Sequence, residues 1–280
     1  MPSVAEKRAT FRALHETGCF VIPNPWDVGS ARYLQSLGFM ALATTSAGFA
    51  FAQGYPDGAV PLNATLVHFR EIVAVTDVPV NADFEGGYAD GPEGVAENVR
   101  RCIETGVAGL SIEDSTGESE NPLYGFDLAL ARVRAARATI DNAGGAVVFT
   151  ARSEGFIRGR PDLDETIRRL RAYADAGADC LYAPGIKTRE EIAAVVKAVA
   201  PKPVNFLMAT ATNFTVNDLA ELGVRRISLG GTLARVAWTA VIRVAREIAN
   251  EGKFDGFTGV MSNAELNKFF AEDLPRRRPT

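Results

Sequence analysis

The sequence predicts a single (β/α)8 barrel, and three observations support this prediction. The chain repeats a unit in which a helical stretch ends at a glycine and a short apolar strand follows. The expected strands are continuous apolar runs, which is typical of parallel strands covered by helices. The length of 280 residues, 47% of them hydrophobic, suits one such barrel. A doubly wound open sheet is the alternative, but no glycine-rich dinucleotide turn follows the first strand.

Eight strands can be placed in order along the chain. Glycine ends the preceding helical stretch before four of them, at Gly38, Gly106, Gly177 and Gly223, and proline lies at the start of two others. We expect strands at residues 19–23, 40–44, 78–85, 108–113, 146–151, 179–183, 202–206 and 225–230.

The segments between the strands have helical periodicity. Residues 164–174 place Ile167, Leu170, Tyr173 and Ala174 on one face, with Asp162 or Asp164 as the cap. A helix at 233–250 is expected to close the barrel. We therefore expect one domain over residues 1–280, with a barrel core at about 11–250, a helical C-terminal extension at 252–271 and a polar, disordered tail at 275–280.

Composition excludes several classes of function. The net charge of −4 and the pI near 5.4 argue against a nucleic-acid or anionic-membrane partner. No apolar run reaches the roughly 18 residues that span a bilayer, and residues 1–8 lack an apolar leader, so we expect a soluble cytoplasmic protein. The cysteines at 19, 102 and 180 are widely spaced, which favours buried reduced thiols over a disulfide or a metal site.

Acidic residues follow several strands of the predicted barrel. Asp83 and Glu85 lie two residues apart at the end of the third strand, so they can converge on one point. Asp57 follows the second strand and Glu113 ends the fourth, at the end of the barrel where such enzymes place their chemistry. A solvated acidic loop is the alternative. Like charges at one mouth favour a divalent cation with oxygen ligands, for which Mg²⁺ fits best.

Arg152 ends the fifth strand and faces these acids. It can bind a substrate carboxylate or phosphonate through two parallel hydrogen bonds, or form a structural ion pair with Glu113 or Glu154. The small segment Ser46-Ala47-Gly48 can bring backbone N–H groups to an oxyanion, or be a plain tight turn. Asn205 ends the seventh strand and is a further candidate for substrate binding.

These residues resemble the isocitrate lyase/phosphoenolpyruvate mutase superfamily. The segment Asp83-x-Glu85-Gly86-Gly87-Tyr88 is similar to its D-x-D/E-x-G-[YF] signature. Other blocks match in the right order over residues 11–248, namely Thr45-Ser46-Ala47-Gly48, Tyr55-Pro56-Asp57, Ser111-Ile112-Glu113-Asp114 and Thr150-Ala151-Arg152.

The resemblance implies a barrel that binds Mg²⁺ or Mn²⁺ and makes or breaks a C–C or P–C bond beside a 2-oxo acid, through a metal-stabilised enolate. It implies that Asp83 binds the metal directly and that Asp57, Glu85 and Glu113 hold its waters. Arg152 and Ser46-Ala47-Gly48 would bind the pyruvate-like part of a small carboxylate substrate. Family members are usually tetramers that exchange a C-terminal helix, so we expect a homo-oligomer, a dimer or tetramer, with the segment after residue 252 exchanged.

One loop departs from the family. Isocitrate and 2-methylisocitrate lyases carry K-[KR]-C-G-H after the fourth strand, with the cysteine as catalytic acid, whereas this chain has none of those residues in its 114–126 lid. Cys102 lies in the preceding helix and cannot replace it. Asn121 resembles the asparagine in the corresponding loop of the mutases and hydrolases, but the residues around it do not match that loop. Three lid residues could supply a proton, namely Glu118, Glu120 and Tyr124, unless the loop is only a mobile connector.

The leading hypothesis is a metal-dependent lyase for a small 2-oxo or 2-hydroxy carboxylate, with Arg152, Ser46 and Glu113 as catalytic residues. Decarboxylation of oxaloacetate needs the least acid–base machinery and suits a lid without the cysteine. The alternatives are P–C bond chemistry on a phosphonopyruvate-type substrate and a non-catalytic 2-oxo acid binder.

Overall fold

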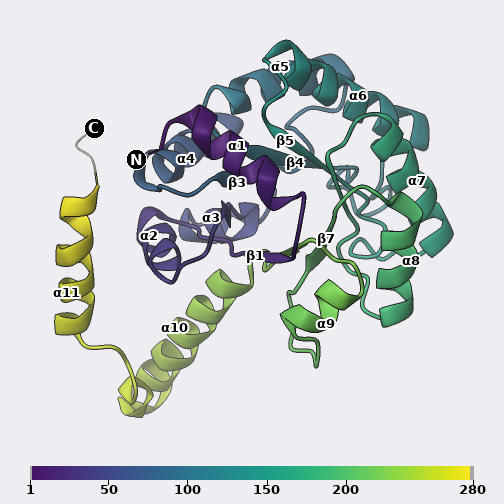
Figure 1. Ribbon diagram of the computed structural model, residues 1–280. Helices are drawn as coiled ribbons and strands as arrows, with labels where there is room; N and C mark the ends of the chain where they lie inside the picture. Colours follow the sequence, from purple (N-terminus) through teal and green to yellow (C-terminus); the bar gives the residue numbers. More distant parts are fainter. Residues whose placement is uncertain (1, 278–280) are drawn as a thin grey trace.

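A computed structural model describes residues 2–277 and contains eight parallel strands. The strands are hydrogen-bonded in the order β1-β8-β7-β6-β5-β4-β3-β2, with helices around them (Figure 1). Their bounds are β1 Phe20–Ile22, β2 Leu42–Ala43, β3 Val80–Asp83, β4 Gly109–Glu113, β5 Val148–Arg152, β6 Cys180–Tyr182, β7 Val204–Leu207 and β8 Arg226–Ser228.

The two end strands of this order meet and nearly close the sheet. The backbone N–H of Ala43, in β2, donates to the carbonyl of Pro23, just after β1, at 3.0 Å. The Asn24 side chain adds a bond to the carbonyl of Thr44 at 2.9 Å. The predicted (β/α)8 barrel is therefore confirmed.

Eleven α-helices and two short 3-10 helices lie among the described residues. They are α1 Val4–Leu14, α2 Val28–Ser36, α3 Ser46–Ala52, α4 Leu62–Val75, α5 Pro92–Ile103, α6 Phe126–Asn142, α7 Leu163–Asp175, α8 Arg189–Val199, α9 Val216–Glu221, α10 Thr232–Glu251, η1 Asp255–Phe257, α11 Asn263–Asp273 and η2 Leu274–Arg276.

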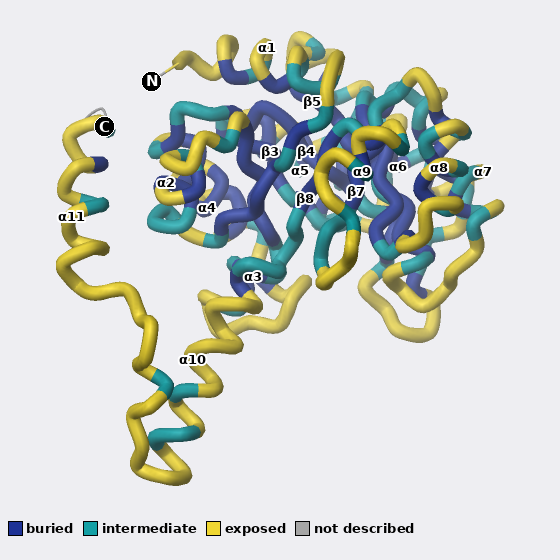
Figure 2. The backbone as a smooth tube through the Cα atoms, turned by 60° about the horizontal axis from the view of Figure 1, so that its bottom comes forward, coloured by how far each residue is buried: buried dark blue, intermediate teal, exposed yellow. Residues whose placement is uncertain are grey.

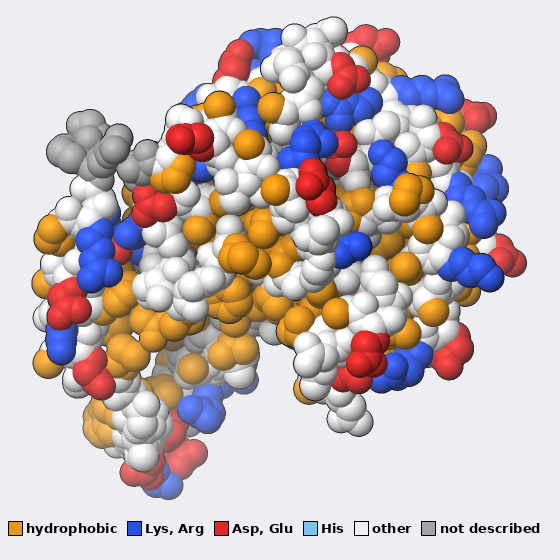
Figure 3. Space-filling view, in the orientation of Figure 1, with side chains coloured by type: hydrophobic (Ala, Val, Ile, Leu, Met, Phe, Trp, Pro, Cys, Tyr) orange, Lys and Arg blue, Asp and Glu red, His pale blue; other side chains and the backbone are white. Residues whose placement is uncertain are grey.

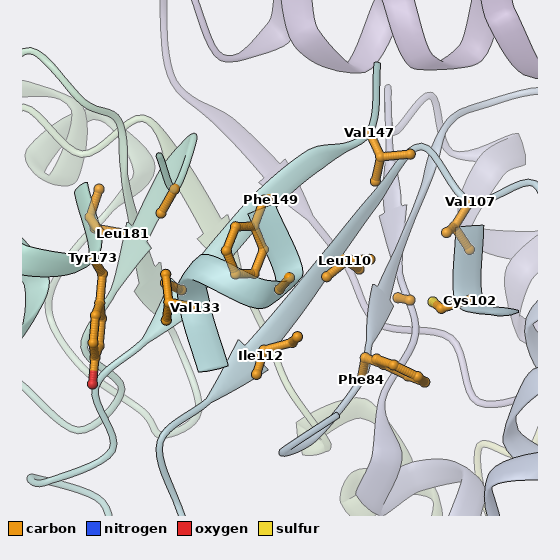
Figure 4. Close-up of a cluster of buried hydrophobic side chains, with 14 of the residues drawn as sticks. Phe84, Cys102, Val107, Leu110, Ile112, Val133, Val147, Phe149, Tyr173 and Leu181 are labelled. Carbon is orange, nitrogen blue, oxygen red and sulfur yellow. The ribbon is translucent and has the colours of Figure 1, made fainter. Parts of the chain in front are cut away.

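The main core lies between the strands and the surrounding helices (Figure 4). Helix α7 shows why its sequence folds this way, because its apolar stripe buries Leu170 and Tyr173 completely. The Asp162 side chain caps this helix by accepting the N–H of Glu165 at 2.9 Å. The helix and its cap confirm what the periodicity predicted.

A second, smaller core fills the amino-terminal end of the barrel. Phe11 of α1 packs there with Phe20, Ala108 and Val148. A Cβ on Gly109 would lie 2.5 Å from the Phe11 ring, so only glycine leaves room for this plug. The plug blocks one end of the barrel, which leaves the carboxyl ends of the strands as the open mouth.

The third strand is shorter than predicted. It ends at Asp83, and Glu85 lies in the following turn with a φ of +46°. Asp83 and Glu85 therefore do not share a strand face, and the predicted reason for their convergence is wrong. A turn brings Glu85 to the mouth instead, because a peptide chain that leaves a barrel strand must bend before the next helix begins.

Helix α10 differs from the prediction that it closes the barrel. Only Ala234 of this helix is buried, and the helix leads away from the barrel into an arm completed by η1 and α11 (Figures 1 and 2). The arm carries exposed apolar side chains that a single chain leaves uncovered, including Val236, Val241, Phe254 and Val260. Figure 3 shows hydrophobic side chains gathered along the hollow between the arm and the barrel.

The end of the arm returns to the barrel at α2. Asp273 forms an ion pair with Arg32, and both side chains are buried. The Tyr33 and Phe269 rings meet edge to face, with centroids 5.0 Å apart. Residues 274–276 form η2, so the predicted disorder is wrong there, and residues 278–280 lie outside the described part of the chain.

The thiols and the membrane prediction can also be compared with the structure. All three cysteines are free, with Cys102 and Cys180 buried and Cys19 only half-buried. Within residues 2–277, no helix combines the length and the apolar character needed to cross a membrane.

Candidate active site

Arg152 lies at the centre of the barrel mouth and contacts three carboxylates. Its guanidinium is 2.9 Å from Asp83, 3.2 Å from Glu113 and 2.8 Å from Glu154. Burial alone lowers the pKa of Arg152, but these three acids raise it, and the net pKa lies well above the ordinary value. Arg152 is therefore a fixed cation, and it forms both ion pairs that the sequence offered as a structural alternative.

The strand register explains how these side chains come together. Directly paired residues on parallel strands point to the same face of the sheet. One continuous row across five strands thus faces the barrel interior, running Glu113, Arg152, Tyr182, Asn205 and Arg226. The row begins at the mouth with charged groups and ends at Arg226, which pairs in register with Phe20 of the apolar plug.

The mouth carries more acid than one arginine can neutralise. Burial is the first cause that raises the pKa of Glu113, and the nearby Asp83 raises it further. Burial also raises the pKa of Glu85 to about 7 and that of Glu154 to about 8. Asp57 is on an exposed loop, but its carboxyl group faces the pocket, where burial and Asp83 raise its pKa. These carboxylates would be more stable beside a further cation.

The backbone beside Glu85 is strained. Glu85 and Tyr88 both have positive φ values, +46° and +56°, which residues other than glycine rarely adopt. The strained turn allows the Tyr88 hydroxyl to donate to Glu85 at 2.9 Å, while Thr65 bonds the same hydroxyl at 2.9 Å. Such strain is often found where a site fixes a side chain, and here it fixes Glu85.

The Ser46-Ala47-Gly48 segment forms the first turn of α3 rather than a free turn. The N–H of Ser46 donates to Asp83 Oδ2 at 3.0 Å, and that of Gly48 donates to Thr45 Oγ1 at 3.2 Å. Among the described residues, only the N–H of Ala47 in this segment remains for an oxyanion. A Cβ on Gly48 would lie 2.7 Å from Thr45 and 2.9 Å from Trp26, so this close approach requires glycine.

Two connected spaces open at the mouth. The outer one, about 580 Å³, is lined by Asp57, Glu85, Glu113 and the lid. The inner one, about 160 Å³, extends into the barrel past Asp83 to Asn205 and Arg226. Four residues line both spaces and mark the boundary between them, namely Ser46, Asp57, Arg152 and Ile157.

The lid is a hairpin-like loop over the outer space. Ser115 bridges to Leu123, and the N–H of Tyr124 donates to the carbonyl of Asp114 at 2.9 Å. Glu118 and Glu120 are exposed, whereas Tyr124 lines the outer space. Of the predicted proton donors in the lid, Tyr124 alone thus lines this space.

Sequence reasoning missed Arg158, offered Glu154 only as an ion-pair partner of Arg152, and placed Asn205 differently. The Arg158 guanidinium lies 3.1 Å from Glu113, and Glu154, 1% exposed, pairs with Arg152. Arg158 follows Glu154 by four residues beyond the fifth strand, which is the only signal that could have suggested it. Asn205 is fully buried and bonded to both Arg226 and Ser228, so it lies deeper than a residue at the mouth.

The acids suit a metal that keeps most of its waters. Within residues 2–277, no three Asp, Glu, His or Cys side chains are arranged as ready-made direct ligands. A hydrated Mg²⁺ needs only one or two direct carboxylates. The raised pKa values of Asp57, Glu85 and Glu113 fit such an ion, because it would supply the missing positive charge.

Comparison with known proteins agrees with this geometry. Residues 11–249 match the family model for phosphoenolpyruvate phosphomutase. A crystal structure of a candidate lyase/mutase from Burkholderia cenocepacia J2315 is 46% identical, with a TM-score of 0.91 and 96% of each chain covered. Oxaloacetate decarboxylase from Paraburkholderia xenovorans is 31% identical over 84% of this chain and 76% of its own length.

Oxaloacetate acetylhydrolase, solved with its product oxalate, is 28% identical, with a TM-score of 0.84 and coverage of 98% of this chain and 96% of its own. Relatives also include 2-methylisocitrate lyases and 2,3-dimethylmalate lyase, which are carbon–carbon lyases. Given the barrel, its acidic mouth and a family match over most of its length, the chain belongs to the isocitrate lyase/phosphoenolpyruvate mutase superfamily.

Proposed function

We propose that this protein is a Mg²⁺- or Mn²⁺-dependent lyase that breaks a C–C bond in a small 2-oxo or 2-hydroxy carboxylate, by cleavage or decarboxylation. The observation that carries the proposal is the group of partly buried acids Asp83, Glu85 and Glu113 at the same mouth as the fixed cation Arg152. Relatives that decarboxylate oxaloacetate or release oxalate from it support this class of substrate.

The metal would be held directly by Asp83, while Asp57, Glu85 and Glu113 would accept hydrogen bonds from its waters. When bound, Mg²⁺ supplies positive charge beside the substrate oxygens, where negative charge develops as the bond breaks. Asp83 is poised for this because Arg152 and Ser46 hold one oxygen each, at 2.9 and 3.0 Å.

Arg152 would bind the carboxylate of the substrate and stabilise the enolate that remains after bond cleavage. Its side chain is nearly buried and lies over the Tyr182 ring, 5.0 Å from the ring centre, so its orientation is fixed before substrate arrives. The N–H of Ala47, at the start of α3, would donate to the enolate oxygen. Fixed donors of this kind usually provide the largest part of catalysis.

P–C bond chemistry on a phosphonopyruvate-type substrate is the second candidate, because the matching family model is that of phosphoenolpyruvate phosphomutase. It requires a nucleophile or phosphoryl acceptor near the lid. The lid residues 114–126 include no Lys, His or Cys, and Asn121 is exposed. The C–C lyase therefore fits the lid better.

A substrate panel tests the proposal. Purified protein with Mg²⁺ is given 2-oxo acids, 2-hydroxy acids and phosphonopyruvate, and the release of pyruvate, CO₂ and phosphate is followed. We expect pyruvate formation from a 2-oxo or 2-hydroxy dicarboxylate, abolished by EDTA. Phosphate release from phosphonopyruvate would favour the second candidate. Oxalate binding without turnover of any compound would indicate a non-catalytic 2-oxo acid binder.

We also propose that the arm from α10 to α11 is exchanged between subunits of a homo-oligomer. Its exposed apolar side chains, among them Trp238, Val241 and Phe257, support a partner surface. Sedimentation of the intact protein checks this: we expect a dimer or tetramer, and a monomer at micromolar concentration would contradict it.

A further inference from the structure

The proposed reaction needs a proton, and the reacting group would lie where the outer and inner spaces meet. That boundary is lined by Ser46, Asp57, Arg152 and Ile157. A donor must therefore reach it either from the lid above or from the barrel interior below. The two directions offer different side chains.

The lid offers few groups. Glu118 and Glu120 are exposed on the loop. Tyr124 lines the outer space, but its hydroxyl donates to Asp90 at 2.6 Å and its ring packs against the Arg132 guanidinium, 4.0 Å from the ring centre. Because its proton is already shared with Asp90, Tyr124 is a poor donor toward the boundary.

The barrel interior offers Tyr182, which ends β6 and lines the inner space. Its ring lies against the Arg152 guanidinium, and only 7% of the residue is exposed. Ser228 donates to the Tyr182 hydroxyl oxygen at 3.5 Å, the longest contact in this chain of bonds. Since the oxygen accepts that bond, the Tyr182 proton remains available to a ligand in the inner space.

The bonds that lead to Tyr182 all point the same way. Arg226 donates to Asn205 Oδ1 at 2.8 Å, and Asn205 donates to Ser228 Oγ at 2.9 Å. Successive donors polarise one another, which favours negative charge on the last oxygen of the chain. Burial raises the pKa of Tyr182 to about 12, although Arg152 and the Ser228 bond oppose this rise, so Tyr182 keeps its proton until a stronger base such as an enolate carbon forms beside it.

The chain starts from an unusual cation. Arg226 is 3% exposed, and its remaining bonds go to Thr150 at 2.9 Å and to the ring of His15 at 3.2 Å. His15 is neutral because burial, with Arg226 beside it, lowers its pKa to about 3. None of the ion pairs within residues 2–277 includes Arg226. A buried cation without a carboxylate stabilises an anion that forms nearby.

We propose that Tyr182 is the proton donor of this enzyme, an inference that rests on the proposed function. When the C–C bond breaks, its electron pair remains on the pyruvate-type enolate. The Tyr182 O–H bond then breaks and a C–H bond forms at the enolate carbon. The tyrosinate, held between Arg152 and the Ser228 hydroxyl, recovers a proton from water that enters as product leaves. Asn205, Ser228 and Arg226 are positioning residues in this scheme.

Proton exchange on pyruvate tests the inference without knowledge of the physiological substrate. Exchange of the methyl protons in D₂O with Mg²⁺ is followed by NMR, and oxalate binding is measured by calorimetry. Tyr182→Phe keeps the ring beside Arg152, so we expect an oxalate Kd within two-fold of wild type and exchange slowed by about 100-fold or more. The control is Tyr33→Phe, which removes the hydroxyl of an exposed tyrosine on α2.

A second pair of variants separates positioning from structure. Ser228→Ala removes the donor to Tyr182, so we expect slower exchange with unchanged oxalate affinity, and Ser228→Thr should restore part of the rate because it keeps a hydroxyl. This rescue would not follow if Ser228 were only a packing residue.

Several results would overturn the inference. Wild-type exchange by a Tyr182→Phe variant that is folded and binds oxalate would overturn it. Loss of exchange in Tyr124→Phe would overturn it as well. Wild-type protein that binds oxalate but exchanges no pyruvate protons also overturns the inference and leaves the proposed metal site intact. Failure of wild type to bind oxalate with Mg²⁺ overturns the proposed function itself.

Discussion

Replacing Arg152 with methionine tests whether one cation holds the acidic mouth together. The change removes the partner of Asp83, Glu113 and Glu154, whose side chains are 18%, 11% and 1% exposed. Removal of one member of a buried ion pair costs about 3–5 kcal/mol. We expect a loss in this range rather than three times as large, because Asp83 keeps the Ser46 N–H and Glu113 keeps Arg158.

The assay is thermal unfolding at pH 8 with EDTA and again with Mg²⁺. For a chain of this size about 2 °C corresponds to 1 kcal/mol, so the loss of Arg152 should lower Tm by about 6–10 °C in EDTA. Mg²⁺ should recover part of this, since a cation at the mouth replaces some of the lost charge. At pH 5 the loss should shrink, because Glu154, with a pKa raised to about 8 by burial, is then protonated.

The matched control is Arg100→Met. Arg100 also pairs with two carboxylates, Glu97 and Glu104, but all three side chains are about half exposed. Exposed ion pairs contribute little to stability, so its Tm should change by no more than about 2 °C. An equal, small effect of both substitutions in EDTA would refute the idea that Arg152 is the fixed cation of the site.

Two further predictions concern Glu85 and the arm. Burial raises the pKa of Glu85 from 4.5 to about 7, so the folded state favours protonated Glu85. The contribution of this protonated side chain to folding stability is therefore complete below pH 4.5 and is lost as pH rises through 7. Urea unfolding in EDTA should therefore find Glu85→Gln more stable than wild type by about 2 kcal/mol at pH 8, and equally stable near pH 4.5. Greater stability of wild type at pH 8 would contradict this. Asp273→Ala leaves the buried Arg32 without its closest partner, so α11 should detach at a cost of about 3 kcal/mol and be cut faster by protease. The control Lys253→Ala removes one member of an exposed pair and should not speed cleavage. Equal cleavage of the two variants would argue against the Arg32–Asp273 contact.

The barrel could be predicted because its signals are local. Glycines after helices, prolines before strands and apolar runs identify the eight strands, and the strand ends then place Asp83, Glu113 and Arg152 at one mouth. Two parallel strands paired in register bring side chains together whatever lies between them in sequence, which is why Glu113 and Arg152 meet as expected.

The remaining features depend on contacts that no local pattern encodes. The turn at Glu85 has a positive φ and is held by the bonds among Glu85, Tyr88 and Thr65. The third strand therefore ends at Asp83 rather than at the predicted residue 85. The direction of α10, which leads away from the barrel with only Ala234 buried, does not follow from its amphipathic pattern. The chain of bonds from Arg226 to Tyr182 needs the register of three strands and the rotamer of each side chain.

The most direct test of a metal-dependent 2-oxo acid site is calorimetric titration of oxalate, with and without Mg²⁺, into wild type and Asp83→Ala. Asp83 joins Arg152 to the N–H of Ser46 and is the proposed direct ligand of the metal. We predict that wild type binds oxalate only with Mg²⁺ and that Asp83→Ala, still folded by circular dichroism, loses this binding. Wild-type affinity in Asp83→Ala, or oxalate binding that is equally tight in EDTA, would contradict the proposed site.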